Sequence, residues 1–186
     1  MSKTLKKNNK MIYKIFLEDQ RDRSAVKLRA YYKKNDWEKL IERDKKRQRA
    51  ILQILRNKNL ALTGEDYFRA GIIFQHGTTL ADFKRAISLA KKGAKMGSEK
   101  AKWLFAAATD RLLLRQGKKQ KFGTQYQKKN NKWQLSPVDK RTTDKERTKY
   151  NVLTLKQAHE KAKRWNKEGI DPWDQRRKTS GITSRK

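Results

Sequence analysis

The stretch that decides the fold is residues 79–115, TLADFKRAISLAKKGAKMGSEKAKWLFAAATDRLLLR. In its first half, apolar side chains recur at helical spacing and share one face: Leu80, Phe83, Ile87 and Ala90. Thr79 can cap this helix, with Asp82 three residues further on. Ser98 can cap a second helix, from about residue 99 to 115. The stretch therefore predicts two successive helices joined by a short turn.

Three further helices are predicted on either side of this stretch. Residues 64–77, GEDYFRAGIIFQHG, are compact, apolar and of helix length, so they form a helical hairpin with the helix that follows. Residues 36–57 present one apolar stripe at helical spacing and a charged opposite face. Thr154 and Gln157 form a capping box for a last helix, which Gly169 ends. The predicted fold class is mainly α, a compact helical-hairpin (αα-repeat-like) domain.

The chain divides by composition into a folded centre and two basic ends. Residues 1–10 hold four lysines and one leucine, which predicts a disordered basic arm. Residues 11–170 form the helical domain, and residues 171–186 form a basic C-terminal tail. Within the domain, residues 116–150 are basic and contain glycines, an Asn–Asn pair and a proline, so we expect mostly loop or hairpin there.

The charge of the chain is the strongest indication of its partner. It carries 50 Lys plus Arg against 19 Asp plus Glu, a formal net charge of +31. Such a charge repels itself unless an anion neutralises it. Nucleic acid does so well, because each phosphate contacted by Lys or Arg releases a counterion. RNA is favoured over DNA as the partner, while an acidic membrane surface or an acidic protein, including other proteins of a large assembly, remain alternatives.

Several classes of protein are disfavoured by residues that the sequence lacks. The chain has no cysteine and two histidines, so a disulfide framework, a Cys-ligated metal and a structural zinc site are not expected. No apolar run reaches the length of a membrane span, and no cleaved export signal is recognisable. Standard catalytic motifs are missing. We expect an intracellular protein without a cofactor, located in a large nucleoprotein particle.

Basic residues of the 116–150 segment and of the tail are the candidate nucleic-acid ligands. They are Lys118, Lys119, Lys121, Lys128, Lys129, Lys132, Arg176, Arg177 and Lys178, with Trp133 among them. Aromatic rings among cations suit single-stranded or looped RNA, because a ring stacks on an unpaired base while lysines hold phosphates. Alternatively Phe122, Tyr126 and Trp133 fold back on the core and only the lysines face outward.

Four short motifs resemble an uncharacterised, mainly bacterial family of helical proteins. They are EDQRDR from residue 18, FQHG from residue 74, WLFAAATDRLLLRQGKKQKFGTQY from residue 103, and a later Asp-then-Arg stretch before the terminal helix. The resemblance covers about residues 15–166, and its most specific part is the loop after TDR. Residues 86–108 also resemble tetratricopeptide or Sel1-type helical hairpins, because small residues there allow close helix crossing.

The resemblance to the bacterial family implies a helical repeat-like fold with a set of characteristic polar positions. It implies no activity, because none is established for the family. Those positions are Asp19, Gln20, His76, Asp110, Arg111, Gln120 and Gln125. These residues could line one pocket, in which His, Asp and Arg perform acid–base chemistry. Alternatively Asp110 and Arg111 tie the helices to the GTQ loop and His76 caps a helix.

Three functions follow from these observations. The first is a structural RNA-binding protein that is a component of a ribosome or of another large ribonucleoprotein. The second is an enzyme or small-ligand module with a pocket around His76, Asp110 and Arg111. The third is a basic structural protein of a virion or nucleoid, for which duplex DNA and structured RNA would bind equally well.

Overall fold

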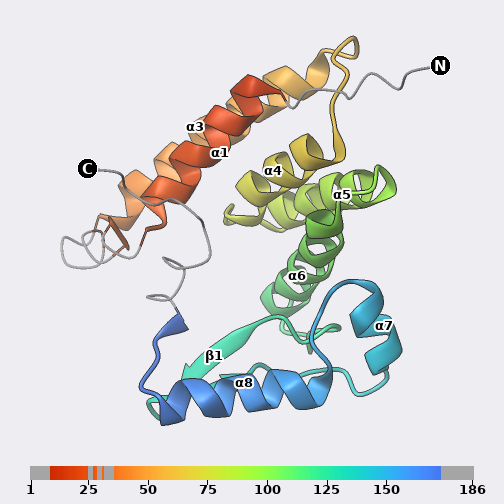
Figure 1. Cartoon of the computed structure of the whole chain (residues 1–186). Helices are drawn as coiled ribbons and strands as arrows, with labels where there is room; N and C mark the ends of the chain where they lie inside the picture. The colour runs from red at the N-terminus through yellow and green to blue at the C-terminus, as the bar shows by residue number, and fades with distance from the viewer. Residues whose placement is uncertain (1–8, 25–26, 29–30, 32–35, 173–186) are drawn as a thin grey trace.

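The computed structural model describes residues 9–24, 27–28, 31 and 36–172 and confirms a mainly helical fold. Figure 1 shows the course of the chain. The helices are α1 (Lys10–Asp22), α3 (Trp37–Arg56), α4 (Gly64–Gln75), α5 (Leu80–Lys95), α6 (Glu99–Arg115), α7 (Asp144–Lys149) and α8 (Leu155–Lys167). Strands β1 (Tyr126–Lys129) and β2 (Lys132–Leu135) form an antiparallel hairpin.

The predicted caps stand at the helix starts. Thr79 and Asp82 form the capping box of α5, Ser98 caps α6, and Thr154 with Gln157 forms the capping box of α8. Each cap satisfies backbone N–H groups that a helix start would otherwise leave without an acceptor. These local bonds explain why the sequence placed these three starts correctly.

Helices α4, α5 and α6 pack as successive antiparallel hairpins at the centre of the molecule (Figure 1). Two glycines allow α4 and α5 to touch: a Cβ built on Gly64 would lie 2.9 Å from the carbonyl oxygen of Gly93, and one on Gly93 would lie 2.8 Å from that of Gly64. Helices α1 and α3 run side by side above this layer and close the main core against α4. The core is built from Ile12, Ile15, Ile51, Ile73, Phe74, Leu89 and their neighbours.

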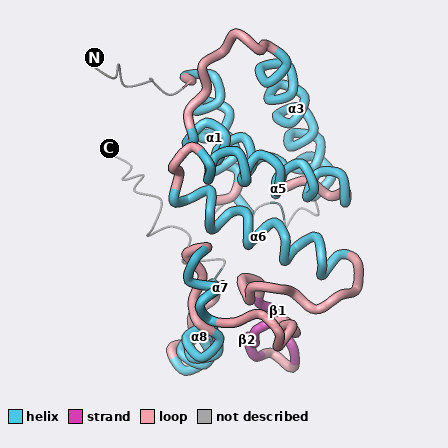
Figure 2. Tube along the Cα trace, turned by 90° about the vertical axis from the view of Figure 1, so that its right-hand side faces the viewer, coloured by secondary structure: helices cyan, strands magenta, loops and turns pink. Residues whose placement is uncertain are grey.

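The C-terminal part of the domain forms a second layer beneath α6, composed of the hairpin, α7 and α8 (Figure 2). Phe105 of α6 packs on Phe122 and stacks on Tyr150, with 5.0 Å between the ring centres of Phe105 and Tyr150. Helix α8 packs on β2. Asn130 and Asn131 have positive φ, as a two-residue hairpin turn requires. The hairpin predicted in the 116–150 segment is therefore present.

Three sequence expectations need correction. Helix α7 lies within the 116–150 segment, for which mostly loop or hairpin and no helix was named. Buried Arg147 donates to the carbonyl oxygens of Phe122 and Thr142 and so anchors this short helix. Residues 9 and 10 of the predicted arm cap and begin α1, whereas residues 1–8 and most of the tail lie outside the described residues. Leu80 was expected to face inward but is 42% exposed, because it is the first residue of α5.

No helix in the described part of the chain has the length and hydropathy needed to cross a membrane.

Candidate functional site

A buried carboxylate at the end of α1 organises the first half of the polar cluster. Asp19 is fully buried and accepts a hydrogen bond from Nδ1 of His76, which lies 3.0 Å from both carboxylate oxygens. Gln20 donates its side-chain amide to Asp19 at 2.8 Å, and Arg23 donates a guanidinium N–H at 2.5 Å. The structure therefore brings together three of the predicted polar residues, Asp19, Gln20 and His76, and adds Arg23.

The protonation of His76 follows from its surroundings. Burial lowers the pKa of His76 to about 4, an effect that Asp19 opposes and that the positive charges of Arg23 and Arg111 strengthen. Burial alone would raise the pKa of Asp19, but its hydrogen bond with His76 and the charge of Arg23 hold it below the ordinary value. At neutral pH the imidazole is consequently neutral and the carboxylate ionised. Because Nδ1 carries the proton donated to Asp19, Nε2 carries the lone pair.

An ion-pair network between α1 and α3 supports this pair. The guanidinium of Arg23 reaches both oxygens of Asp44, at 3.1 and 2.6 Å. Buried Arg47 binds Asp44 at 2.7 Å and also binds Asp22 of α1. Burial raises the pKa of Asp44 and lowers that of Arg47. Buried charges are tolerated only when they are paired, so this network fixes α1 on α3 and thereby fixes the carboxylate of Asp19.

Asp110 forms the centre of the second half of the cluster. Its Oδ1 accepts the backbone N–H groups of Lys121 and Phe122, at 2.8 and 2.7 Å. Its Oδ2 accepts both the backbone N–H and the hydroxyl of Thr124, at 2.9 and 2.8 Å. Burial raises the pKa of Asp110, while these hydrogen bonds oppose the rise. Asp110 thus holds the loop that follows α6, which is the structural role considered for it from the sequence.

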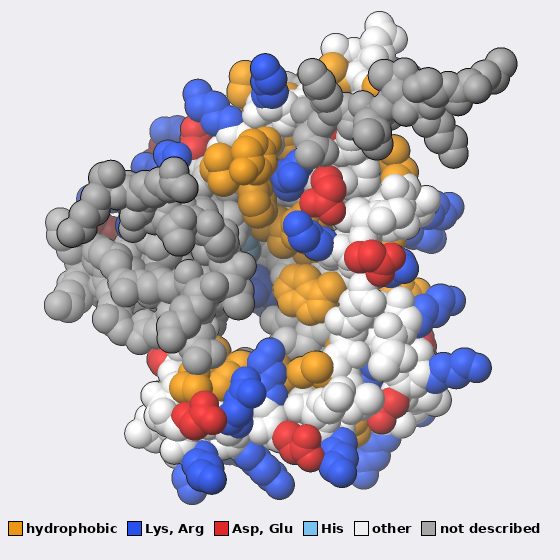
Figure 3. All heavy atoms as spheres, in the orientation of Figure 1, with side chains coloured by type: hydrophobic (Ala, Val, Ile, Leu, Met, Phe, Trp, Pro, Cys, Tyr) orange, Lys and Arg blue, Asp and Glu red, His pale blue; other side chains and the backbone are white. Residues whose placement is uncertain are grey.

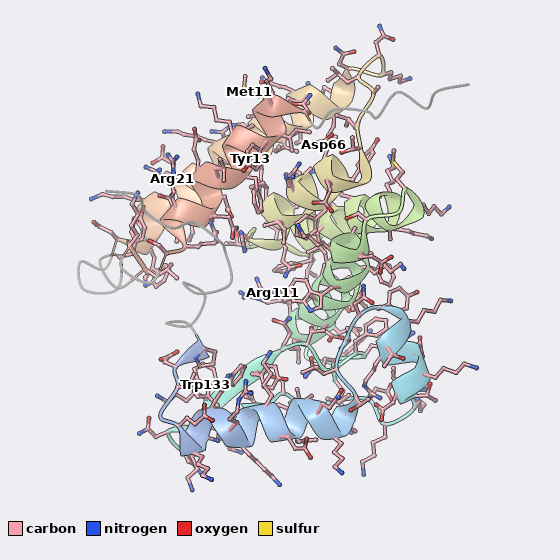
Figure 4. The ribbon with its side chains drawn as sticks, viewed as in Figure 1. Met11, Tyr13, Arg21, Asp66, Arg111 and Trp133 are labelled. Atoms are coloured by element: carbon pink, nitrogen blue, oxygen red, sulfur yellow. The ribbon has the colours of Figure 1, made fainter. Side chains whose placement is uncertain are left out.

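Arg111 and the two glutamines join the halves of the cluster. Arg111 donates to the carbonyl oxygen of Gln75 at 3.0 Å and to the side-chain oxygen of Gln125 at 3.2 Å. Figure 4 shows its side chain extending from α6 into the region between the upper helices and the hairpin. Gln120 is fully buried; its amide donates to the carbonyl oxygens of Gln125 and Ser136. Gln120 and Asp110 therefore shape the loop, and Arg111 ties it to the end of α4 beside His76.

A small cavity opens beside His76. It has a volume of about 160 Å³ and lies between α3 and the turn that joins α4 to α5. Asp44, Lys45 and Gln48 line it from α3, and His76 lines it from the turn. Asp110 and Arg111 do not line this cavity. Of the three residues predicted around one pocket, the structure places only His76 at this opening.

The predicted RNA-contacting lysines form two groups in the C-terminal layer. Lys118, Lys119 and Lys121 line an open cleft of about 710 Å³ together with Arg141. Lys128, Lys129 and Lys132 are exposed on the hairpin. Lys121 is bound to Glu146 at 2.7 Å, and Arg141 is bound to Asp139 at 2.6 Å. Figure 3 shows lysine and arginine side chains along the lower edge of the molecule, over this layer.

An aromatic cluster lies beside the second lysine group. Half-buried Trp133 contacts Trp165 of α8 edge to face, with 6.2 Å between the rings, and Tyr126 contacts the same tryptophan at 4.7 Å. The hairpin register places Lys128 directly opposite Trp133. A cavity of about 150 Å³ borders Lys128, Trp133 and Trp165. Phe122, by contrast, is 1% exposed and belongs to the core, as the alternative interpretation of the aromatic residues supposed.

Some predicted ligands lie outside the described residues, and some residues of the candidate site were not predicted from the sequence. Arg176, Arg177 and Lys178 are outside the described residues. Sequence reasoning did not name Arg23, Asp44, Gln48 or Trp165 as functional candidates, although Arg23 follows Asp19 at the i,i+4 spacing of helical ion pairs.

No family model, curated protein or solved structure matches the chain.

Proposed function

We propose that the protein is a structural RNA-binding protein, a component of a ribosome or of another large ribonucleoprotein. The observation that carries this proposal is the unequal burial of charge. Among the described residues five carboxylates are buried, those of Asp19, Asp22, Asp44, Asp66 and Asp110, but only two guanidiniums, those of Arg47 and Arg147. Among the described residues, burial thus removes more negative than positive charge from the surface of a chain whose formal charge is +31. A surface of this kind binds phosphate backbones through counterion release.

The aromatic cluster favours RNA with unpaired bases over a duplex. Trp133 lies opposite Lys128 on the hairpin, so a base can stack on the ring while the ammonium group holds the adjacent phosphate. Bases in a duplex are already stacked on one another and cannot stack on the ring of Trp133. A basic virion or nucleoid protein, the main alternative, would rely on phosphate contacts alone and would bind duplex DNA as tightly as structured RNA.

Replacing Trp133 with Leu tests the proposal. We expect the Trp133→Leu variant to bind a single-stranded RNA 12-mer about tenfold more weakly than the wild type, because one base–aromatic stack contributes about 1–3 kcal/mol. Affinity for a duplex RNA of equal charge should not change. The measurement is fluorescence anisotropy of labelled RNA in 0.1 M KCl. Trp103→Leu is the matched control, since Trp103 is 40% exposed on α6, outside the aromatic cluster.

The possible results separate the two parts of the proposal. If the wild type binds no RNA under these conditions, the RNA-binding function is wrong. If it binds RNA but Trp133→Leu and Trp103→Leu behave alike, the phosphate contacts stand and the stacking role of Trp133 does not. Equal affinity of the wild type for duplex DNA and for single-stranded RNA would support the virion or nucleoid alternative.

A further inference from the structure

His76 and Asp19 are arranged like a general base and the carboxylate that orients it. The buried carboxylate fixes Nδ1 of the imidazole at 3.0 Å, and Gln20 and Arg23 hold that carboxylate in turn. In this tautomer the lone pair is on Nε2, the atom with which an oriented histidine accepts a proton from a substrate. Nothing in the proposed RNA-binding surface uses this pair, so it needs an explanation of its own.

The cavity beside His76 contains a second indication of a ligand. Gln48 lines the cavity and is 9% exposed, and its buried amide nitrogen has no hydrogen-bond partner in the described part of the chain. A buried donor without an acceptor costs free energy, which a ligand oxygen would recover. His76 and Gln48 therefore line the same small cavity, and one is an oriented imidazole while the other carries an unused hydrogen-bond donor.

The size and charge of the cavity restrict the ligand. Its volume of about 160 Å³ is below the usual range of about 300–1,000 Å³ for sites that hold drug-sized ligands, so it accepts one small group such as a sugar ring. Asp44 and Asp82 line it, and their carboxylates disfavour an anion but can accept hydrogen bonds from hydroxyl groups. Lys45, exposed at its edge, can hold a phosphate outside.

We propose that this cavity receives a ribose of bound RNA and that Nε2 of His76 removes the proton of its 2′-hydroxyl. The proposal rests on the RNA binding proposed above. The 2′-oxygen forms a bond to the adjacent phosphorus, and the bond from phosphorus to the 5′-oxygen breaks. Water protonates the departing 5′-oxygen, and the resulting hydroxide takes the proton back from His76. The products are an RNA end with a 2′,3′-cyclic phosphate and an RNA end with a 5′-hydroxyl.

Cleavage of an end-labelled single-stranded RNA tests this proposal. We expect the wild type to produce 2′,3′-cyclic phosphate ends and His76→Asn to be at least about 10²-fold slower, the usual range for loss of a general base. Asparagine retains an N–H at the position of Nδ1 and so can keep the bond to Asp19. His159→Asn, which changes the exposed histidine on α8, should cleave at the wild-type rate. A 2′-O-methyl RNA should bind and remain intact.

The pH profile distinguishes His76 from a contaminating nuclease with an ordinary histidine. Charged groups from four helices surround His76: Asp19 and Arg23 at the end of α1, Asp44 and Lys45 on α3, Asp82 on α5 and Arg111 on α6. Because burial lowers the pKa of His76 to about 4, kcat/KM should hold its neutral-pH value down to pH 5 and fall only near pH 4. An ordinary histidine would lose most of its activity by pH 5.

Each result of these assays either supports or overturns the proposed RNA cleavage. Cleavage that His76→Asn abolishes and His159→Asn does not, with 2′-O-methyl RNA intact, supports the proposal. RNA that is bound but not cleaved overturns it and leaves the RNA-binding function in place. Equal cleavage by wild type and His76→Asn shows a contaminant and also overturns it. If no RNA is bound, the proposed function fails first, and this failure is visible in the binding assay.

Discussion

Asp110→Ala should lower the free energy of unfolding by about 4 kcal/mol, because four buried or partly buried donors lose their acceptor. Each unpaired donor costs about 1–3 kcal/mol, and water that enters the site recovers part of this cost. The loop that Asp110 holds carries Phe122, which lies in the core contact between α6 and the C-terminal layer. Loosening it should therefore weaken the attachment of the whole layer. The measurement is equilibrium unfolding in urea, followed by far-UV circular dichroism.

Asp139→Ala provides the control for this result. Asp139 also accepts several hydrogen bonds, but they come from its neighbour Arg141 on the surface, where water replaces them. We expect no measurable change in stability for Asp139→Ala. If Asp110→Ala were equally harmless, the loop would not depend on this carboxylate, and the structural role assigned to Asp110 would be incorrect.

Removing five lysines of the C-terminal layer should have the largest effect on RNA affinity. The variant replaces with Ala five predicted ligands that are exposed in the described part of the chain: Lys118, Lys119, Lys128, Lys129 and Lys132. If each holds one phosphate, the slope of log affinity against log salt becomes shallower by about four. Near 0.1 M salt the affinity should then fall by roughly three orders of magnitude. The measurement is the dissociation constant of single-stranded RNA across a KCl titration.

A second five-lysine variant separates position from total charge. It replaces Lys84, Lys91, Lys92, Lys95 and Lys100, which are exposed on α5 and at the start of α6. Both variants lose the same charge, so a purely long-range attraction would weaken equally in both. We expect the α5 variant to keep most of the wild-type affinity. Equal losses in the two variants would mean that the cleft and the hairpin are not the RNA-binding surface.

The parts of the fold that the sequence predicted are those set by neighbouring residues. Thr79 and Asp82 are three residues apart, and their reciprocal hydrogen bonds form within one helical turn. The Asn130–Asn131 turn is likewise local, because both residues tolerate positive φ. Helix α7 escaped prediction because its stability depends on buried contacts of Arg147 with Phe122, 25 residues earlier in the chain.

The candidate site shows the same division between local and distant interactions. The exposure of the hairpin lysines could be predicted, because charged side chains without nearby partners stay in water. The pairing of Asp19 with His76, 57 residues apart, could not be derived from spacing. It depends on how α1 packs against the end of α4, and only the assembled core determines that packing. The helical spacing of residues 36–57 placed Gln48 on the buried stripe, but it gave no sign that Gln48 would line a cavity with His76.

The measurement that tests the RNA-binding function most directly is sedimentation of the native protein. A lysate of its own cells is prepared in low salt, half of it is treated with ribonuclease, and both halves are separated on a sucrose gradient. The charge distribution predicts that the protein travels with a large particle and that ribonuclease releases it to the top of the gradient. Sedimentation as a free small protein in both halves would contradict the proposal that it belongs to a ribonucleoprotein.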